Sequence, residues 1–172
     1  MEKNVFNKRL FFVIWLIVSA AWIAFIIFHS TMGADESGNE SMNVLNFFNG
    51  FLSWLGLSAE LSEHIIRKAA HFTEFAILGG LTLWTGRCLN QKLLKNLMPV
   101  SFVCLLTAVV DEFIQLFSPG RSAEVADVVL DYSGSLIGML LLCLILGIIN
   151  IIRKAKQGGS APEEPQNNDQ EG

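Results

Sequence analysis

Charged residues are scarce in this chain of 172 residues, at 16% of the sequence, while hydrophobic residues make up 52%. An average soluble domain carries roughly 25% charged residues. This deficit argues against a water-soluble globular protein and indicates a chain that folds in a lipid bilayer. The length is sufficient for one domain and too short for two that fold independently.

Cysteine is scarce as well, with Cys88, Cys104 and Cys143 as the three examples. An odd number of cysteines, in or beside apolar stretches, argues against a disulfide framework and against a zinc site built from thiolates. A basic patch with interleaved aromatic residues is also missing, which argues against nucleic-acid binding. The sequence therefore predicts no nucleic-acid partner, no cofactor and no metal site.

Long apolar runs fill most of the remaining chain. Residues Leu10 to Phe28 are nineteen positions without a charge, about the ~20 residues that cross the hydrocarbon core. A cleaved signal peptide is the alternative, but its apolar part spans only about 7–15 residues. We predict an all-α membrane domain over residues 1–156, with four transmembrane helices near 10–28, 65–86, 97–117 and 128–152. A disordered cytoplasmic tail is predicted over residues 157–172.

Two of these spans are less regular than the others. The span over 65–86 opens with Arg67-Lys68 and contains His71 and Glu74, so a soluble amphipathic helix would look similar. Its assignment depends on the neighbouring spans. In the third span Pro99 is expected in the first turn, where its missing N–H costs least.

Lysine and arginine are absent between His29 and Glu63, a segment that contains five acidic residues. Basic residues gather instead at the N-terminus, between the second and third spans, and after the fourth span: Lys3, Lys8, Arg9, Arg87, Lys92, Lys95, Arg153, Lys154 and Lys156. The positive-inside rule places these three groups on the cytoplasmic side. We therefore predict that both termini are cytoplasmic.

The first outer loop contains a stretch rich in Phe, Trp and Leu over residues 43–57. It is too short to cross the bilayer. An interfacial or re-entrant helix with aromatic rings at the headgroup level is one interpretation. An element that caps the helices is the other, and the length does not separate them.

Ionisable residues inside the predicted spans lie near their non-cytoplasmic ends. Such residues cost at least ~2.5–3.5 kcal/mol at the centre of a bilayer and need partners or water. Helical rise places Glu74 about 9 Å from Lys68, and Asp131 about 6 Å from Asp127. We therefore expect one polar cluster, which consists of Lys68, His71, Glu74, Asp111, Glu112, Gln115, Arg121, Asp127 and Asp131.

The polar cluster has two interpretations. Its charges neutralise one another and hold the helices together, or they form a binding or catalytic pocket. Buried ion pairs are weak evidence for a function, whereas ionisable groups inside a membrane are candidates for one. Below the cluster, Gly134 and Gly138 are spaced for close helix packing.

Three motifs resemble the VanZ-like family: R-K-A-A-H-F-T-E-F from Arg67, D-E-F-I-Q-L-F-S-P-G-R from Asp111, and D-x-x-x-D-x-x-G-x-x-x-G from Asp127. The F-H-S stretch that ends at Ser30 is a weaker fourth match. The resemblance implies a four-helix domain of a bacterial cytoplasmic membrane, and an association of the founding member with low-level resistance to teicoplanin. It also implies that Pro119 and Gly120 form a turn beside Arg121. The chain departs from the family at Asp131, where Asn is common, and at Phe75, where Tyr is common.

Several functions remain open at this stage. The first is a binding or shielding module for a glycopeptide, a lipid-linked cell-wall precursor or a lipid headgroup. The second is a membrane-surface hydrolase or transferase, with His71 as a base or with carboxylates that hold a divalent cation; no catalytic motif supports it. Transport through a homo-oligomer and a structural scaffold are further alternatives. Membrane lipids are the expected partners.

Overall fold

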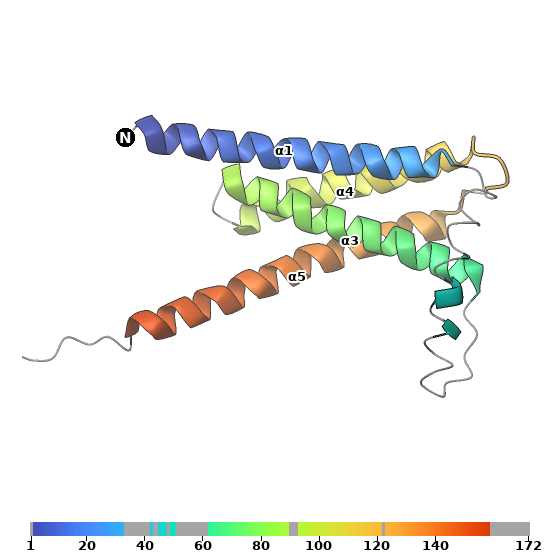
Figure 1. The fold of residues 1–172 in the computed structure, drawn as a ribbon. Helices are drawn as coiled ribbons and strands as arrows, with labels where there is room; N and C mark the ends of the chain where they lie inside the picture. Colours follow the sequence, from blue (N-terminus) through green and yellow to red (C-terminus); the bar gives the residue numbers. More distant parts are fainter. Residues whose placement is uncertain are drawn as a thin grey trace, which may run out of the picture.

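The fold is all-helical over the residues that the computed structural model describes, which are 2–32, 42, 45–47, 49–50, 62–89, 93–121 and 123–158. Four long helices account for most of them: α1 (Glu2–Ser30), α3 (Glu63–Leu89), α4 (Leu93–Gln115) and α5 (Val125–Gly158). Successive long helices run in opposite directions (Figure 1).

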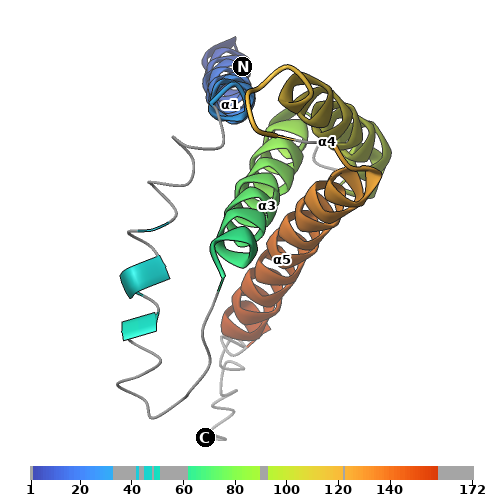
Figure 2. The same cartoon turned by 90° about the vertical axis from the view of Figure 1, so that its right-hand side faces the viewer.

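Helix α3 is the central element of this arrangement. It contacts α1, α4 and α5, whereas α1 and α5 share no contact within the described residues. The first half of α5 crosses α3, and its second half diverges from the other helices (Figure 1). The second view shows α3 and α5 side by side (Figure 2). Three helices therefore cover α3 on different sides.

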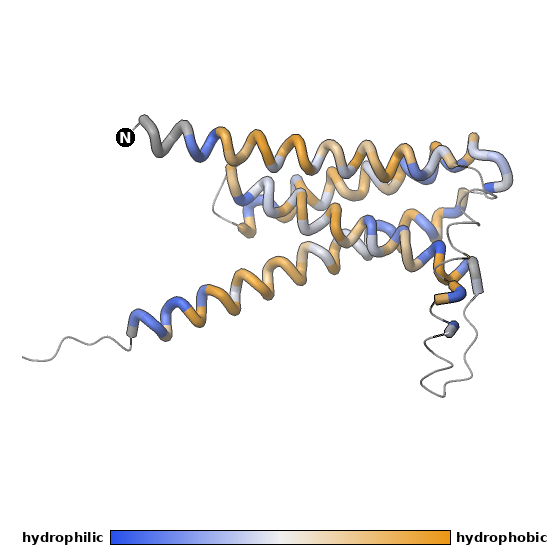
Figure 3. Tube along the Cα trace, viewed as in Figure 1, coloured by the Kyte–Doolittle hydropathy of each residue, from blue (hydrophilic) through white to orange (hydrophobic). Residues whose placement is uncertain are grey.

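Three of the four helices are long and apolar enough to cross a membrane, over Asn7–Ser30, Leu93–Gln115 and Val125–Gln157. Large apolar side chains on them face outward, among them Ile17, Phe102 and Ile151. Hydrophobic residues occupy the middle of the helices and hydrophilic residues gather toward their ends (Figure 3). This pattern is typical of helices whose outer surface contacts lipid.

Helix α3 is less apolar because its polar groups face other helices. Near its C-terminal half, the hydroxyls of Ser19 and Thr85 lie 2.9 Å apart, and Thr85 also donates to the carbonyl of Trp15 at 3.1 Å. Closer to its beginning, the indole N–H of Trp22 donates to the carbonyl of Glu74 at 3.0 Å. Polar contacts of this kind hold α1 against α3 where lipid offers no hydrogen-bond partner.

Glycines bring the backbones of α3 and α5 close together. A Cβ at Gly134 would lie 2.5 Å from the carbonyl oxygen of Phe72, and one at Gly138 would overlap the carbonyl oxygen of Ala76. In the opposite direction, a Cβ at Gly79 would overlap the backbone of Ser135. The absence of side chains at these positions is what permits the α3–α5 crossing.

The helix bounds differ from the predicted spans in informative ways. Helix α4 ends at Gln115, two residues before the predicted end, and a turn follows in which Gly120 has a φ of 74°. The expectation for Pro99 is wrong, because α4 begins at Leu93 and places this proline inside the helix. The apolar run that begins at Leu97 does not reveal that the helix starts four residues earlier, before Lys95 and Asn96.

Two predictions fall largely outside the described residues. The interfacial or re-entrant helix over 43–57 is described only at 45–47 and 49–50, which are helical. The tail over 157–172 is described only as the last two residues of α5. Both remain predictions.

Candidate functional site

The polar cluster lies where α3 begins, α4 ends and α5 begins, at the hydrophilic end of the helices on the right of Figure 3. Lys68, His71 and Glu74 come from α3, and Arg121 comes from the connection between α4 and α5. The remaining members come from α4 and α5: Asp111, Glu112, Gln115, Asp127 and Asp131. Residues more than fifty positions apart in sequence thus meet at one end.

The end of α1 also reaches the cluster, which the predicted site does not include. The imidazole of His29 lies 3.2 Å from Glu74 Oε1, and its ring centroid is 6.0 Å from that of His71. The hydroxyl of Ser30 donates a short hydrogen bond to Asp111 Oδ1. The F-H-S stretch was the only sequence signal for these two residues.

Asp111 is fixed by partners from two helices. It is fully buried, and besides Ser30 it accepts a hydrogen bond from Gln115 Nε2 at 2.9 Å. The hydroxyl of Ser118 in turn donates to the carbonyl of Ser30 at 2.7 Å. These bonds hold the carboxylate of Asp111 in one orientation and tie the ends of α1 and α4 together.

Two other acids of the cluster have partners that hold helices in place. Lys68 Nζ lies 2.5 Å from Asp127 Oδ1 and joins α3 to α5. Glu112 Oε1 accepts the backbone N–H of Glu124 at 2.6 Å, just before α5 begins. Part of the cluster thus has the arrangement expected of ion pairs and caps that hold the helices together.

Beside these pairs lies a cavity of about 80 Å³. Its lining is rich in basic side chains and includes His64, Arg67, Lys68, His71, Gln115, Gly120, Arg121, Glu124, Asp127, Leu130 and Asp131. Pro119 and Gly120 form the turn that leads into Arg121. Gly134 and Gly138 lie outside the cavity, at the α3–α5 contact.

Arg121 has two donor atoms whose hydrogen bonds are not made within the part of the chain that the structure describes. Its Nε and Nη2 atoms are buried and have no hydrogen-bond partner among the described residues. Burial lowers the pKa of the Arg121 guanidinium from its ordinary value, and the nearby charge of Arg67 lowers it further. An arginine keeps its charge in proteins. A bound anion would therefore stabilise the charged guanidinium, which burial and Arg67 disfavour.

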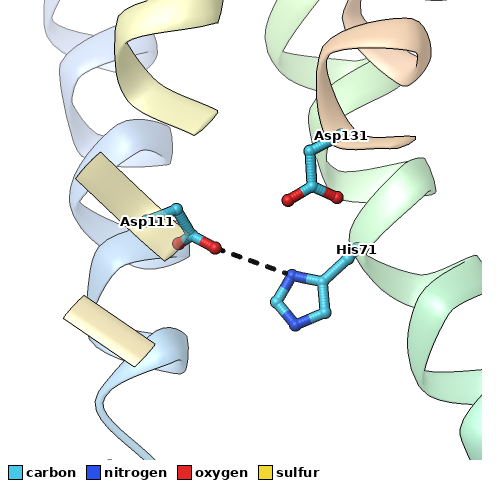
Figure 4. A group of neighbouring side chains, drawn as sticks. All are labelled: His71, Asp111 and Asp131. Atoms are coloured by element: carbon cyan, nitrogen blue, oxygen red, sulfur yellow. Dashed lines mark ion pairs between the residues drawn. The ribbon is translucent and has the colours of Figure 1, made fainter. Parts of the chain in front are cut away.

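Three further residues beside the cavity include buried atoms without a hydrogen-bond partner among the described residues. His71, Asp111 and Asp131 come from three different helices, and one nitrogen or oxygen atom of each lies within 4.8 Å of the others. Figure 4 shows both carboxylates facing the space around the His71 ring, with His71 Nδ1 4.0 Å from Asp111 Oδ2. Asp131 Oδ1 is buried without a hydrogen-bond partner. Among the described residues, these three have the donor types and the spacing to hold a metal ion.

The comparisons with known proteins give one match. The VanZ/LLP1 family model matches residues 12–147, which include the whole polar cluster. No curated protein matches the chain, and no solved structure does.

Proposed function

The chain belongs to the VanZ/LLP1 family and is a membrane protein, and from this premise we propose that it binds the phosphate group of a membrane lipid or a lipid-linked cell-wall precursor. The phosphate is held by Arg121, in the cavity at the end of the helices where the polar cluster lies. Lys68 and Arg67 add positive charge to the same cavity.

The observation that carries this proposal is the pair of unused donors on Arg121. A guanidinium presents a planar set of N–H groups that matches the oxygens of phosphate and carboxylate. Buried donors without partners are costly, so proteins rarely leave them free unless a ligand or water completes them. The cavity beside Arg121 supplies the space for such a group.

The size of the cavity selects among the predicted ligands. Pockets for drug-sized molecules measure roughly 300–1,000 Å³, several times the ~80 Å³ found here. A whole glycopeptide does not fit, whereas a phosphate group with its lipid chain left outside does. We therefore narrow the predicted ligand from glycopeptide, precursor or headgroup to the phosphate of the latter two.

The position of the cavity suggests how the protein acts in a cell. The basic groups at the opposite ends of the helices support a cytoplasmic location for both termini. In that orientation the cavity faces the outer side of a bacterial cytoplasmic membrane, which is part of the proposal. A protein that engages a lipid-linked precursor there would shield it from a glycopeptide. Low-level resistance to teicoplanin is the consequence that the VanZ-like resemblance supports.

The experiment is a binding titration with purified protein in a neutral detergent. The ligands are phosphatidylglycerol, a polyprenyl diphosphate, inorganic phosphate, and diacylglycerol as a lipid without phosphate. Arg121→Gln removes the guanidinium, and we expect it to weaken binding of the phosphate lipids by about tenfold to a hundredfold, the effect of losing hydrogen bonds to a charged group.

Arg87→Gln is the matched control, because Arg87 lies at the other end of α3 beside Trp84. This variant should bind phosphate lipids as the unchanged protein does. Binding of diacylglycerol as strong as that of phosphatidylglycerol would contradict the proposal, and so would equal losses in the two variants. Inorganic phosphate binding as tightly as the lipids would assign the site to free phosphate instead.

A further inference from the structure

His71, Asp111 and Asp131 form a group that the ion pairs of the cluster explain only in part, because His71 pairs with Asp111 at 4.0 Å while Asp131 Oδ1 has no hydrogen-bond partner among the described residues. The three residues are 8%, 0% and 2% exposed, respectively. Lys68, the lysine of the cluster, is already paired with Asp127. Two carboxylates in one buried space repel each other unless a cation or a proton lies between them.

Two of the three residues have unused atoms at this position. His71 Nδ1 and Asp131 Oδ1 are buried and have no hydrogen-bond partner among the described residues. Asp131 also lines the cavity, as does His71. His71 Nδ1 also lies 4.0 Å from Asp111 Oδ2 and 3.9 Å from Glu74 Oε2, so carboxylate oxygens surround this nitrogen at distances that leave space for a cation between them.

We infer that His71, Asp111 and Asp131 bind one divalent transition-metal ion at the inner end of the cavity. Metal sites that also bind water or substrate usually have three protein ligands and leave one coordination position free. Here the free position would face the cavity. The inference goes beyond the proposed binding of lipid phosphate and does not depend on it.

The donor set indicates the kind of ion. Imidazole suits zinc and other transition metals, whereas calcium takes six to eight oxygen ligands. Zinc bonds of about 2.0–2.2 Å would place tetrahedral ligand atoms roughly 3.3–3.6 Å apart. The three atoms lie within 4.8 Å of one another. Side-chain rotations that move these atoms by about an ångström would bring them to the spacing of zinc ligands.

The surroundings of Asp111 fit this role. Ligating carboxylates are commonly oriented by hydrogen bonds from further residues, and Asp111 accepts one from Ser30 and one from Gln115. Asp111 thus reaches the site already oriented, whereas Asp131 Oδ1 is free to turn toward the ion.

The test uses the untagged full-length protein in detergent, stripped with a chelator and without added lipid phosphate. Zinc, manganese and calcium are titrated separately by calorimetry, and the bound metal is counted by mass spectrometry after gel filtration. We expect one equivalent of zinc or manganese, with calcium at least tenfold weaker. Asp131→Asn should weaken transition-metal binding about a hundredfold or more, beyond the 10–100-fold typical of losing an outer partner.

Asp127→Asn is the matched control, because it removes the same charge one turn earlier on α5 and spares the three ligands. Its metal affinity should change less than threefold. Circular dichroism of both variants shows whether each remains helical. A stripped protein that takes up neither zinc nor manganese would overturn the inference, as would equal losses in the two variants while both stay folded.

The two proposals fail separately. Arg121→Gln should keep its metal while it loses lipid phosphate, and Asp131→Asn should lose its metal. Retention of metal by Asp131→Asn at the affinity of the unchanged protein would contradict the metal site alone.

Discussion

At the residue scale, the polar cluster contains side chains of two kinds. Lys68 and Asp127 form an ion pair, and Glu112 accepts a hydrogen bond from a backbone N–H. Arg121 and Asp131 keep buried atoms without partners among the described residues. The paired side chains explain how the helix ends stay together. The side chains with unpartnered buried atoms are the ones that a bound ligand would stabilise most.

Ser30 provides a test of the structural half of the cluster. Its hydroxyl donates to the fully buried Asp111, so Ser30→Ala should lower the free energy of unfolding by about 1–3 kcal/mol, the cost of leaving a buried acceptor unsatisfied. Thermal unfolding in detergent, followed by circular dichroism, measures this change.

Thr31→Ala is the control for this prediction. Its exposed hydroxyl donates to the carbonyl of Phe28 in the preceding turn, so the change should stay within about 0.5 kcal/mol. Equal melting temperatures for Ser30→Ala and the unchanged protein would show that the bond to Asp111 contributes nothing to stability.

Much of the cluster was predictable from the sequence because helical spacing places the acids of three spans at one depth. Which atoms find partners was not predictable. That outcome depends on the end of α1, where His29 and Ser30 reach Glu74 and Asp111. Spacing within one helix says nothing about the rotation of its neighbour, and α1 is apolar on nearly all sides.

At the scale of the elements, the arrangement depends on α3. It contacts every other long helix that the structure describes and carries the most polar sequence of the four. A helix with Arg67, Lys68, His71 and Glu74 is expensive to expose to lipid. Its central position among three more apolar helices reduces the contact of these polar residues with lipid.

Gly138 tests the close crossing of α3 and α5. A Cβ there would overlap the carbonyl oxygen of Ala76, and a backbone atom cannot turn aside as a side chain can. Gly138→Val should therefore lower the free energy of unfolding by about 1–3 kcal/mol or more, as overpacking does. Thermal unfolding in detergent is again the measurement.

Gly147→Val supplies the comparison within the same helix, because a Cβ at Gly147 meets nothing within 4 Å. The melting temperature of this variant should stay at or above that of the unchanged protein, since glycine is a poor helix former. Equal melting temperatures for the two valine variants would contradict the close contact between the backbones of α3 and α5 at Gly138.

The existence of the long helices was predictable, since the apolar runs are close to the length of a bilayer crossing. The ends were not, because each of the four helices extends past its apolar run at one end or at both. The central place of α3 was not predictable either. The pattern in its first half fits a soluble amphipathic helix as well, and only contacts with α1, α4 and α5 distinguish the two.

At the scale of the whole molecule, the chain has an apolar middle and two hydrophilic ends (Figure 3). Arg87, Lys95 and Arg153 lie near helix ends on one side, and the other side contains the polar cluster with its cavity. The central claim is that the cavity holds the phosphate of a lipid that reaches it from the surrounding bilayer.

The most direct measurement of this claim is photocrosslinking in native bacterial membranes. Leu130 lines the cavity, and a photoreactive amino acid in its place samples whatever is bound there without removing a charged residue. The same amino acid at Leu140, an exposed position further along α5, samples ordinary contact with lipid. Lipid adducts are then identified by mass spectrometry.

We expect position 130 to capture lipids that contain phosphate, enriched over those captured at position 140, and Arg121→Gln to abolish that enrichment. The same set of lipids at both positions would contradict the account. An enrichment that persisted in Arg121→Gln would contradict it equally, because the lipid would then be held without the guanidinium.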